Sequence, residues 1–248
     1  MGDDPRAAAA TRVVGVDGYR DGWVAAHVGP DGAVRWSVAP VGGFADLVAP
    51  SAAGPSRGPV AIGVDIPVGA PDSGWRACDL EAKEALGRAA SRVFLTPPRP
   101  VLALGPTADN ARAQALSRRL TGQGVSRQAL ALADRIRDVD AALRAHPVLA
   151  RVLVEVHPEL SFAAMTGGPP LPSKRTAVGV AQRLDALAPW VDAIAALRRC
   201  PDRVPVDDAL DALAAAWSGA RWAAGTARTL PGGPVPRDGT GLPMRIVV

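Results

Sequence analysis

The sequence has 248 residues, of which 48% are hydrophobic and 21% are charged. This profile is typical of a globular protein that buries a hydrophobic core without needing disulfides or structural metals. Its two cysteines, Cys78 and Cys200, cannot form a disulfide scaffold, and the chain has no Cys-x-x-Cys pair for a zinc ribbon. No apolar run approaches a membrane span, and residues 1–11 lack the pattern of a secretory signal. We therefore expect a single domain over residues 1–248, located in the cytoplasm, with no membrane partner.

The charge is unevenly distributed along the chain. The formal net charge is +4, but seven arginines and a single acid, Asp109, lie between Arg88 and Arg127, so this segment carries +6. Such a segment can attract a polyanion, and a solvated helical face is the alternative interpretation. Because Phe94 is its single aromatic residue, a nucleic-acid partner would be held by phosphates with weak sequence selectivity. The residues that we predict for nucleic-acid binding are Arg92, Arg99, Arg118, Arg119 and Lys174.

The first part of the chain is predicted to form strands. Short apolar runs separated by turn residues indicate an antiparallel meander over residues 12–17, 23–28 and 33–38. A short helix is expected over 42–48, and composition predicts a loop over 50–59. Residues 60–66 (V-A-I-G-V-D-I) repeat the pattern of the first strand and predict another buried strand.

Residues 70–150 change character and are predicted to form a helical insert within the domain, either a lid or a subdomain. Helices are expected over 78–88 and from Ser126 onward, where an apolar stripe has helical spacing at Leu132, Ile136, Val139 and Leu143. The run T-P-P-R-P at 96–100 is expected to form no regular element.

The rest of the chain returns to alternating elements. A buried strand is predicted over 151–156, followed by helices over 174–187, 189–199 and 206–224 and an edge strand over 244–248. A meander followed by strands that are reached through helical connections predicts an α/β fold. Its one mixed sheet combines an antiparallel meander with parallel strands and is flanked by helices.

Two acids, Asp17 and Asp65, end buried strands in a repeated Gly-Val-Asp pattern. If these strands are parallel neighbours about 4.8 Å apart, both carboxylates can reach one divalent cation that relieves their repulsion. The alternative is that each aspartate caps a turn.

Further acids follow later in the chain. Glu155 interrupts the strand V-L-V-E-V, pointing either into the site or outward. Asp208 and Asp211 are three residues apart on the last helix, although helical geometry places Asp207 nearer the buried stripe than Asp208. Oxygen-only ligands favour Mg²⁺ or Mn²⁺ over zinc. We predict Asp17, Asp65, Asp208 and Asp211 as metal ligands, and these four with Glu155 as catalytic residues.

Several motifs, in order over most of the chain, resemble the predicted RNase-H-like nuclease family, domain of unknown function number 429: G-V-D-G-Y-R-D-G-W (15–23), V-D-I-P-V-G (64–69), R-A-C-D (76–79), V-F-L-T-P-P-R (93–99), V-E-V-H-P-E-L-S-F (154–162), S-K-R-T (173–176) and D-D-A-L-D-A-L-A-A-A-W (207–217). The resemblance implies a ribonuclease H-like fold with an acidic metal site. Asp21 departs from it, since the family has a small glycine there. The last helix also resembles that of bacterial Holliday-junction resolvases, which favours Asp208 and Asp211 as ligands.

These observations predict a metal-dependent nuclease that hydrolyses phosphodiester bonds of structured nucleic acid. Two alternatives remain open. One is a non-catalytic module of the same fold that binds a nucleotide or a protein partner, for which the acids need not converge. The other is a phosphotransferase, which the length of the chain disfavours because such enzymes need two of these domains around a nucleotide cleft.

Overall fold

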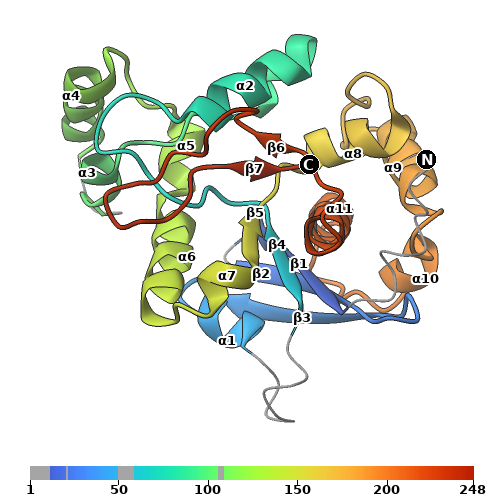
Figure 1. Cartoon of the computed structure of the whole chain (residues 1–248). Coiled ribbons are helices and arrows are strands. Elements are labelled where there is room, and N and C mark those ends of the chain that lie inside the picture. Colours follow the sequence, from blue (N-terminus) through green and yellow to red (C-terminus); the bar gives the residue numbers. More distant parts are fainter. Residues whose placement is uncertain (1–11, 21, 50–58, 106–108) are drawn as a thin grey trace.

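The computed structural model describes residues 12–20, 22–49, 59–105 and 109–248 (Figure 1). Five strands form one sheet in the order β3-β2-β1-β4-β5. The first three make an antiparallel meander, while β4 is parallel to β1 and β5 is parallel to β4. This mixed sheet confirms the predicted fold class and is consistent with a ribonuclease H-like fold. The strands are β1 (Val13–Tyr19), β2 (Gly22–Val28), β3 (Val34–Pro40), β4 (Ala61–Val64) and β5 (Leu153–Glu155).

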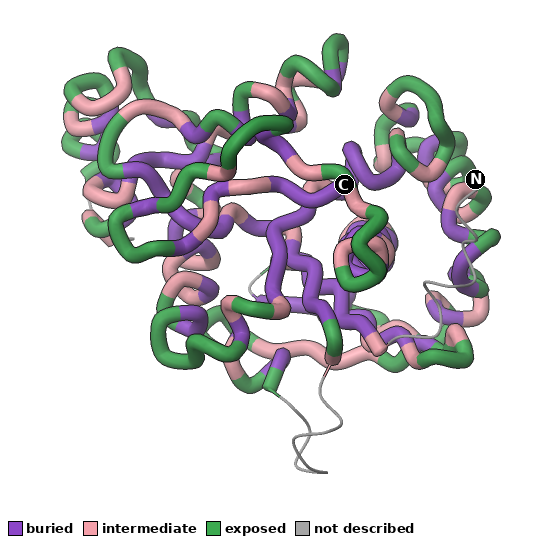
Figure 2. The backbone as a smooth tube through the Cα atoms, in the orientation of Figure 1, coloured by how far each residue is buried: buried purple, intermediate pink, exposed green. Residues whose placement is uncertain are grey.

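Helices cover both faces of the sheet, which is why β1 and β4 are apolar at successive positions rather than at every second one. Helix α11 (Val206–Ala223) packs on one face, and α1 (Phe44–Val48) and α6 (Ala133–Ala145) pack on the other. Figure 2 shows the result, with the central strands and most of α11 buried.

The contact between α11 and the sheet is unusually close because glycines face the helix. Gly15 in β1 pairs in register with Gly63 in β4. A Cβ atom on Gly15 would lie 1.9 Å from the carbonyl oxygen of Ala212, and one on Gly63 would lie 2.0 Å from that of Ala215. Neither distance is sterically possible, so only glycine allows the helix backbone to approach this far. The repeated Gly-Val-Asp pattern therefore also determines how deeply α11 sits.

The segment between β4 and β5 is helical. It contains α2 (Ala77–Leu86), the 3₁₀-helix η3 (Gly87–Arg92), α3 (Arg99–Leu102), α4 (Asn110–Thr121), α5 (Arg127–Ala131), α6 and α7 (Leu149–Val152). Two local expectations were wrong. Ser126 does accept the N–H of Ala129 as an N-cap, but the helix breaks at Leu132 into α5 and α6. The T-P-P-R-P run does enter a helix, because Pro100 falls in the first turn of α3, where no N–H is needed.

The C-terminal part contains α8 (Pro158–Thr166), α9 (Ala177–Leu187), α10 (Ala193–Leu197), β6 (Thr229–Leu230) and β7 (Ile246–Val247). The predicted strand 151–156 is shorter than expected because its first residues belong to α7. The predicted edge strand, β7, pairs with β6 in a separate two-stranded sheet, and a bridge between Val247 and Val156, the residue after β5, links it to the end of the main sheet.

Two sequence expectations concern residues that the structure does not describe. Asp21 and nearly all of the loop predicted over 50–59 lie outside the described residues. Within the residues that the structure describes, no helix is both long and apolar enough to cross a membrane.

Candidate metal centre

Two strand ends deliver Asp17 and Asp65 to the same place. Alternation along a strand puts residues two apart on the same face, so Asp17 shares the face of Gly15, toward α11. Asp65 follows β4 directly, and its backbone N–H donates to the carbonyl of Val16, 2.9 Å away, which continues the parallel register. The two aspartates therefore lie side by side at the carboxyl ends of neighbouring strands.

Helix α11 supplies the third carboxylate. The close contact at Gly15 and Gly63 brings the first turns of α11 down to the sheet, with Asp211 facing the strand ends. One carboxylate oxygen from each of Asp17, Asp65 and Asp211 lies within 4.8 Å of the other two. Asp17 and Asp211 are almost fully buried, at 6% and 3% exposure. We call these three residues the carboxylate cluster.

Bringing three carboxylates together out of water has an electrostatic cost. Burial and the neighbouring acids raise the pKa of Asp17 and of Asp65 well above the ordinary value, with Asp65 repelling Asp17 and Asp211 repelling both. Burial also raises the pKa of Asp211, against the lowering effect of Lys174. A bound cation would remove this cost, because it supplies the charge that the carboxylates lack.

Lys174 is the cation that the chain itself provides. Its ammonium group forms a hydrogen-bonded ion pair with Asp211 and lies 3.8 Å from Asp207. Burial lowers the pKa of Lys174, but Asp211, Asp17 and Asp65 outweigh burial and raise it. Lys174 was predicted to bind nucleic acid, and the structure places its ammonium at the carboxylate cluster.

The carboxylate cluster also fits a metal ion by its donor chemistry. Asp211 Oδ1 is buried and has no hydrogen-bond partner within the described part of the chain. A buried carboxylate oxygen without a hydrogen-bond donor raises the free energy of the folded state unless a ligand binds to it. The three groups offer only oxygen atoms, which suits Mg²⁺ or Mn²⁺.

The structure separates the predicted ligands on α11. Asp211 lies in the carboxylate cluster, whereas Asp208 does not belong to the set of oxygens within 4.8 Å. Asp208 is half-buried one turn earlier, where burial and Asp207 raise its pKa to about 6. Asp207 faces Lys174 instead. The sequence alone left the choice between Asp207 and Asp208 open, and the geometry brings neither of them to Asp17 and Asp65 as closely as Asp211.

Glu155, predicted as catalytic, points inward but is held by a different partner. Its two oxygens accept hydrogen bonds from Arg76 at 2.6 and 2.7 Å, and one of them also accepts the N–H of Val68 at 2.7 Å. Arg76 is fully buried and binds Asp79 as well. Burial raises the pKa of Glu155 to about 7, although Arg76 lowers it. Arg76 and Asp79 were missed as site residues, and the R-A-C-D motif was their only sequence signal.

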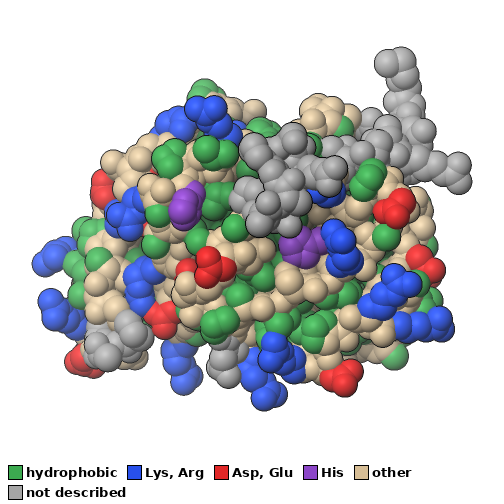
Figure 3. All heavy atoms as spheres, turned by 90° about the horizontal axis from the view of Figure 1, so that it is seen from below, with side chains coloured by type: hydrophobic (Ala, Val, Ile, Leu, Met, Phe, Trp, Pro, Cys, Tyr) green, Lys and Arg blue, Asp and Glu red, His purple; other side chains and the backbone are tan. Residues whose placement is uncertain are grey.

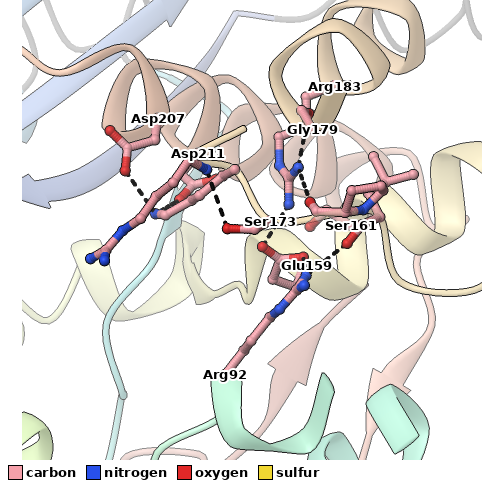
Figure 4. A network of polar contacts seen from close by, with 12 residues as sticks. Arg92, Glu159, Ser161, Ser173, Gly179, Arg183, Asp207 and Asp211 are labelled. Atoms are coloured by element: carbon pink, nitrogen blue, oxygen red, sulfur yellow. Dashed lines mark hydrogen bonds and ion pairs between the residues drawn. The ribbon is translucent and has the colours of Figure 1, made fainter. Parts of the chain in front are cut away.

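A second buried ion-pair network holds the loop that carries Lys174. Arg183 is fully buried and donates to Glu159 at 2.7 Å and to the carbonyls of Pro172 and Gly179 at 2.8 and 2.9 Å (Figure 4). Arg92 donates to the other oxygen of Glu159 at 2.7 Å. Glu159 therefore ties α8, α9 and η3 together beside the carboxylate cluster, and it lies close enough to add to the negative charge at Asp65.

The predicted nucleic-acid residues fall into two groups. Arg92, Arg99 and Lys174 are paired with carboxylates: Arg92 with Glu159, and Arg99 with Asp140 and Asp238. By contrast, Arg118 and Arg119 are exposed on α4 and form no ion pair with any described residue. On the face seen in Figure 3, lysines and arginines are spread out and interleaved with acids rather than gathered in one patch.

The carboxylate cluster opens into a cavity of about 490 Å³. Its wall comes from segments that are far apart in the sequence, including the ends of β1, β4 and β5, the η3 segment, α5 and the loop before α9. The titratable and charged residues lining it are Asp17, Asp65, Arg76, Asp79, Arg92, Glu155, His157, Glu159, Lys174, Arg175 and Asp211. With every side chain ionised, six carboxylates would face four lysine and arginine side chains there, a formal excess of two negative charges that one divalent cation would balance.

Comparison with known proteins gives one family. The family model described as "Protein of unknown function (DUF429)" matches residues 15–235, which include the whole five-stranded sheet except the first two residues of β1. No curated protein and no solved structure matches the chain.

Proposed function

The chain belongs to the DUF429 family, and we propose that it is a divalent-metal-dependent nuclease that hydrolyses phosphodiester bonds of structured nucleic acid. The observation that carries this proposal is the convergence of Asp17, Asp65 and Asp211 from three separate elements onto one point. A non-catalytic module would not require that convergence. The unpartnered Oδ1 of Asp211 adds support, because a buried acceptor without a donor calls for a ligand.

Under this proposal, Asp17, Asp65 and Asp211 would hold Mg²⁺ or Mn²⁺, and Asp208 lies about one turn before Asp211 on α11, outside the cavity lining. The ion would act as a Lewis acid that stabilises the charge developing on the phosphate oxygens during hydrolysis. In the overall reaction, a water oxygen bonds to phosphorus, the bond from phosphorus to one sugar oxygen breaks, and that oxygen leaves as an alcohol after taking up a proton.

The chain's other residues have supporting roles. Glu155 and Arg76 hold the backbone at Val68, three residues beyond Asp65, and so fix the exit of β4. The ammonium of Lys174 lies close enough to the carboxylate cluster to meet a phosphate there. Among the residues predicted for nucleic-acid binding, the exposed pair Arg118 and Arg119 on α4 forms no ion pair with any described residue and would be free to bind a phosphate backbone.

We place this activity in the cytoplasm. Both cysteines are free thiols, Cys78 within the core and Cys200 half-buried. Burial raises the pKa of Cys200 to about 11 and that of Cys78 further, so neither thiol is activated as a nucleophile. Free cysteines are typical of reducing compartments.

The direct test is cleavage of labelled branched DNA, RNA–DNA hybrid and single strands with Mg²⁺ or Mn²⁺. We expect cleavage that stops on chelation and that falls by a factor of about 100 or more in Asp17→Asn and Asp65→Asn. Asp185→Asn, an exposed aspartate on α9, is the matched control and should leave the rate unchanged. Equal rates in all three variants and the wild type would overturn the proposal.

A further inference from the structure

We propose that the cavity beside the carboxylate cluster receives a single nucleotide unit, either the terminal nucleotide of a strand or a free nucleotide, with Arg175 as the cation that meets its phosphate. This inference rests on the proposed phosphodiester hydrolysis and deepens it, because it names the part of a nucleic acid that the site accepts. Its basis is the size of the cavity, its charge and the residues that line it.

The size of the cavity favours a small ligand. At about 490 Å³ it falls within the range of small-molecule and cofactor sites, which are roughly 300–1,000 Å³. Proteins that grip the middle of a duplex instead use broad interfaces that bury roughly 1,000–2,500 Å² of protein surface. The carboxylate cluster opens into this space, whose lining includes residues 91–94, Gln128, Leu132 and residues 173–175.

The lining offers one cation that is not already committed. Arg76 and Arg92 are bound to carboxylates, and Lys174 is paired with Asp211. Arg175 lines the cavity, is exposed, and forms no ion pair with any described residue. A guanidinium group at the mouth of a site with a divalent cation at its base can hold a phosphate from two sides.

Three further residues in the lining suit a nucleoside. Phe94 is half-buried and offers an aromatic surface on which one base can stack. Gln128 is exposed at the start of α5 and offers an amide to a base edge or sugar. The Nδ1 atom of His157 is buried without a hydrogen-bond partner among the described residues. A single stacking surface accommodates one base rather than a run of bases, which agrees with the size of the cavity.

Binding can be measured separately from cleavage. The probes are adenosine 5′-monophosphate and a short single strand with and without a 5′-phosphate, titrated by calorimetry with Mg²⁺ present. We expect Arg175→Gln to weaken binding of the monophosphate by about tenfold, since it removes one charge-assisted hydrogen bond. Arg198→Gln is the matched control, because Arg198 is an exposed arginine at the end of α10, outside the cavity lining, and it should bind as the wild type does.

A second arm compares a linear single strand with a covalently closed circle of the same sequence in the cleavage assay. We expect the circle to be cut at least about ten times more slowly, because it has no terminal nucleotide. Tighter binding of the 5′-phosphorylated strand than of the monophosphate identifies a strand end as the ligand, and the reverse identifies a free nucleotide.

The outcomes separate this inference from the proposed hydrolysis. If the circle and the linear strand are cut at equal rates and the monophosphate does not bind, the cavity inference is overturned while the nuclease stands. If no strand is cut but the monophosphate binds in an Arg175-dependent way, the cavity inference stands and the hydrolysis fails. Binding that Arg175→Gln leaves unchanged overturns the role of Arg175.

Discussion

Gly15 of β1 and Gly63 of β4 lie opposite each other in register, and the backbone of α11 crosses directly over both of them. This contact determines the depth of α11 and therefore the position of Asp211, which lies on the same helix within a turn of Ala212 and Ala215. The carboxylate cluster thus depends on two residues that have no side chains.

Gly63→Ala tests this dependence. The new methyl group would lie 2.0 Å from the carbonyl oxygen of Ala215, so the helix must move outward or the strand must distort. We expect a loss of about 3 kcal/mol in the free energy of unfolding, measured with urea, together with weaker metal binding. Gly233→Ala is the control, since a Cβ atom there meets no atom within 4 Å. Equal stability of the two variants would show that α11 does not rest on Gly63.

Asp17→Asn should stabilise the metal-free protein while abolishing its response to metal. The amide removes a buried carboxylate whose pKa is raised by burial and by Asp65, and its oxygen can still accept the N–H of Gly18. We expect the melting temperature with chelator to rise by about 2–4 °C, the effect of ~1 kcal/mol in a domain of this size. The stabilisation by Mg²⁺ or Mn²⁺ that we expect in the wild type should disappear, and Asp185→Asn should behave like the wild type. A lower melting temperature in Asp17→Asn would contradict this account.

The raised carboxylate pKa values also set a pH dependence. Glu155 has a folded-state pKa of about 7, whereas an unfolded glutamate titrates near about 4.3. Between these values the folded protein holds a proton that the unfolded chain has released, so the free energy of unfolding falls as the pH rises. Asp17 and Asp65 act in the same direction. In urea titrations with chelator, the stability advantage of Asp17→Asn over the wild type should grow between about pH 4 and pH 7. A constant difference across this range would mean that Asp17 titrates normally.

Removing Arg76 should be strongly destabilising. Arg76 is fully buried between Glu155 and Asp79, and Arg76→Met leaves two buried carboxylates without their cation. We expect a loss of about 3–5 kcal/mol in the free energy of unfolding at neutral pH, with a smaller loss near pH 4, where Glu155, whose pKa burial raises, is protonated. Arg203→Met, at an exposed arginine before α11, is the control. A loss below about 1 kcal/mol would show that water reaches these carboxylates.

Substitutions in α4 test whether the basic segment binds nucleic acid. Arg118→Gln with Arg119→Gln removes two exposed, unpaired charges, and we expect weaker nucleic-acid binding and a salt dependence reduced by about two ions. The pair Arg198→Gln with Arg199→Gln is matched, because these are also adjacent exposed arginines at the end of a helix. If the two double variants bind alike, nucleic acid does not contact α4.

Local sequence patterns predicted the strands and helices whose formation depends on neighbouring residues or on regular spacing of apolar residues. The meander, the repeated Gly-Val-Asp strands and the last helix follow from alternation, helical spacing and turn residues. The break at Leu132 was not predicted, because the apolar stripe continues through it. Helix α8 was also missed, although Pro158 at its start and Glu159 in its first turn are ordinary signals of a helix N-terminus.

The sequence predicted which types of residue form the candidate site, but it did not predict which side chains form ion pairs with one another. Asp17 and Asp65 were expected together on the assumption that their strands are parallel neighbours, and they are. The partners of Glu155 and Lys174 lie 79 and 37 residues away along the chain, so no local pattern specifies them. Only the folded chain shows that Arg76 and Asp211 take these roles.

Lys174 gives the carboxylate cluster a tethered counterion. Three converging carboxylates would otherwise oppose the final docking of α11 on the sheet until an ion arrived from solution. With an ammonium group carried by the polypeptide itself, the chain can complete its fold where free divalent ions are scarce. A divalent ion that binds as we propose would have to compete with this internal amine, so folding of the chain and loading of the site would be separable steps.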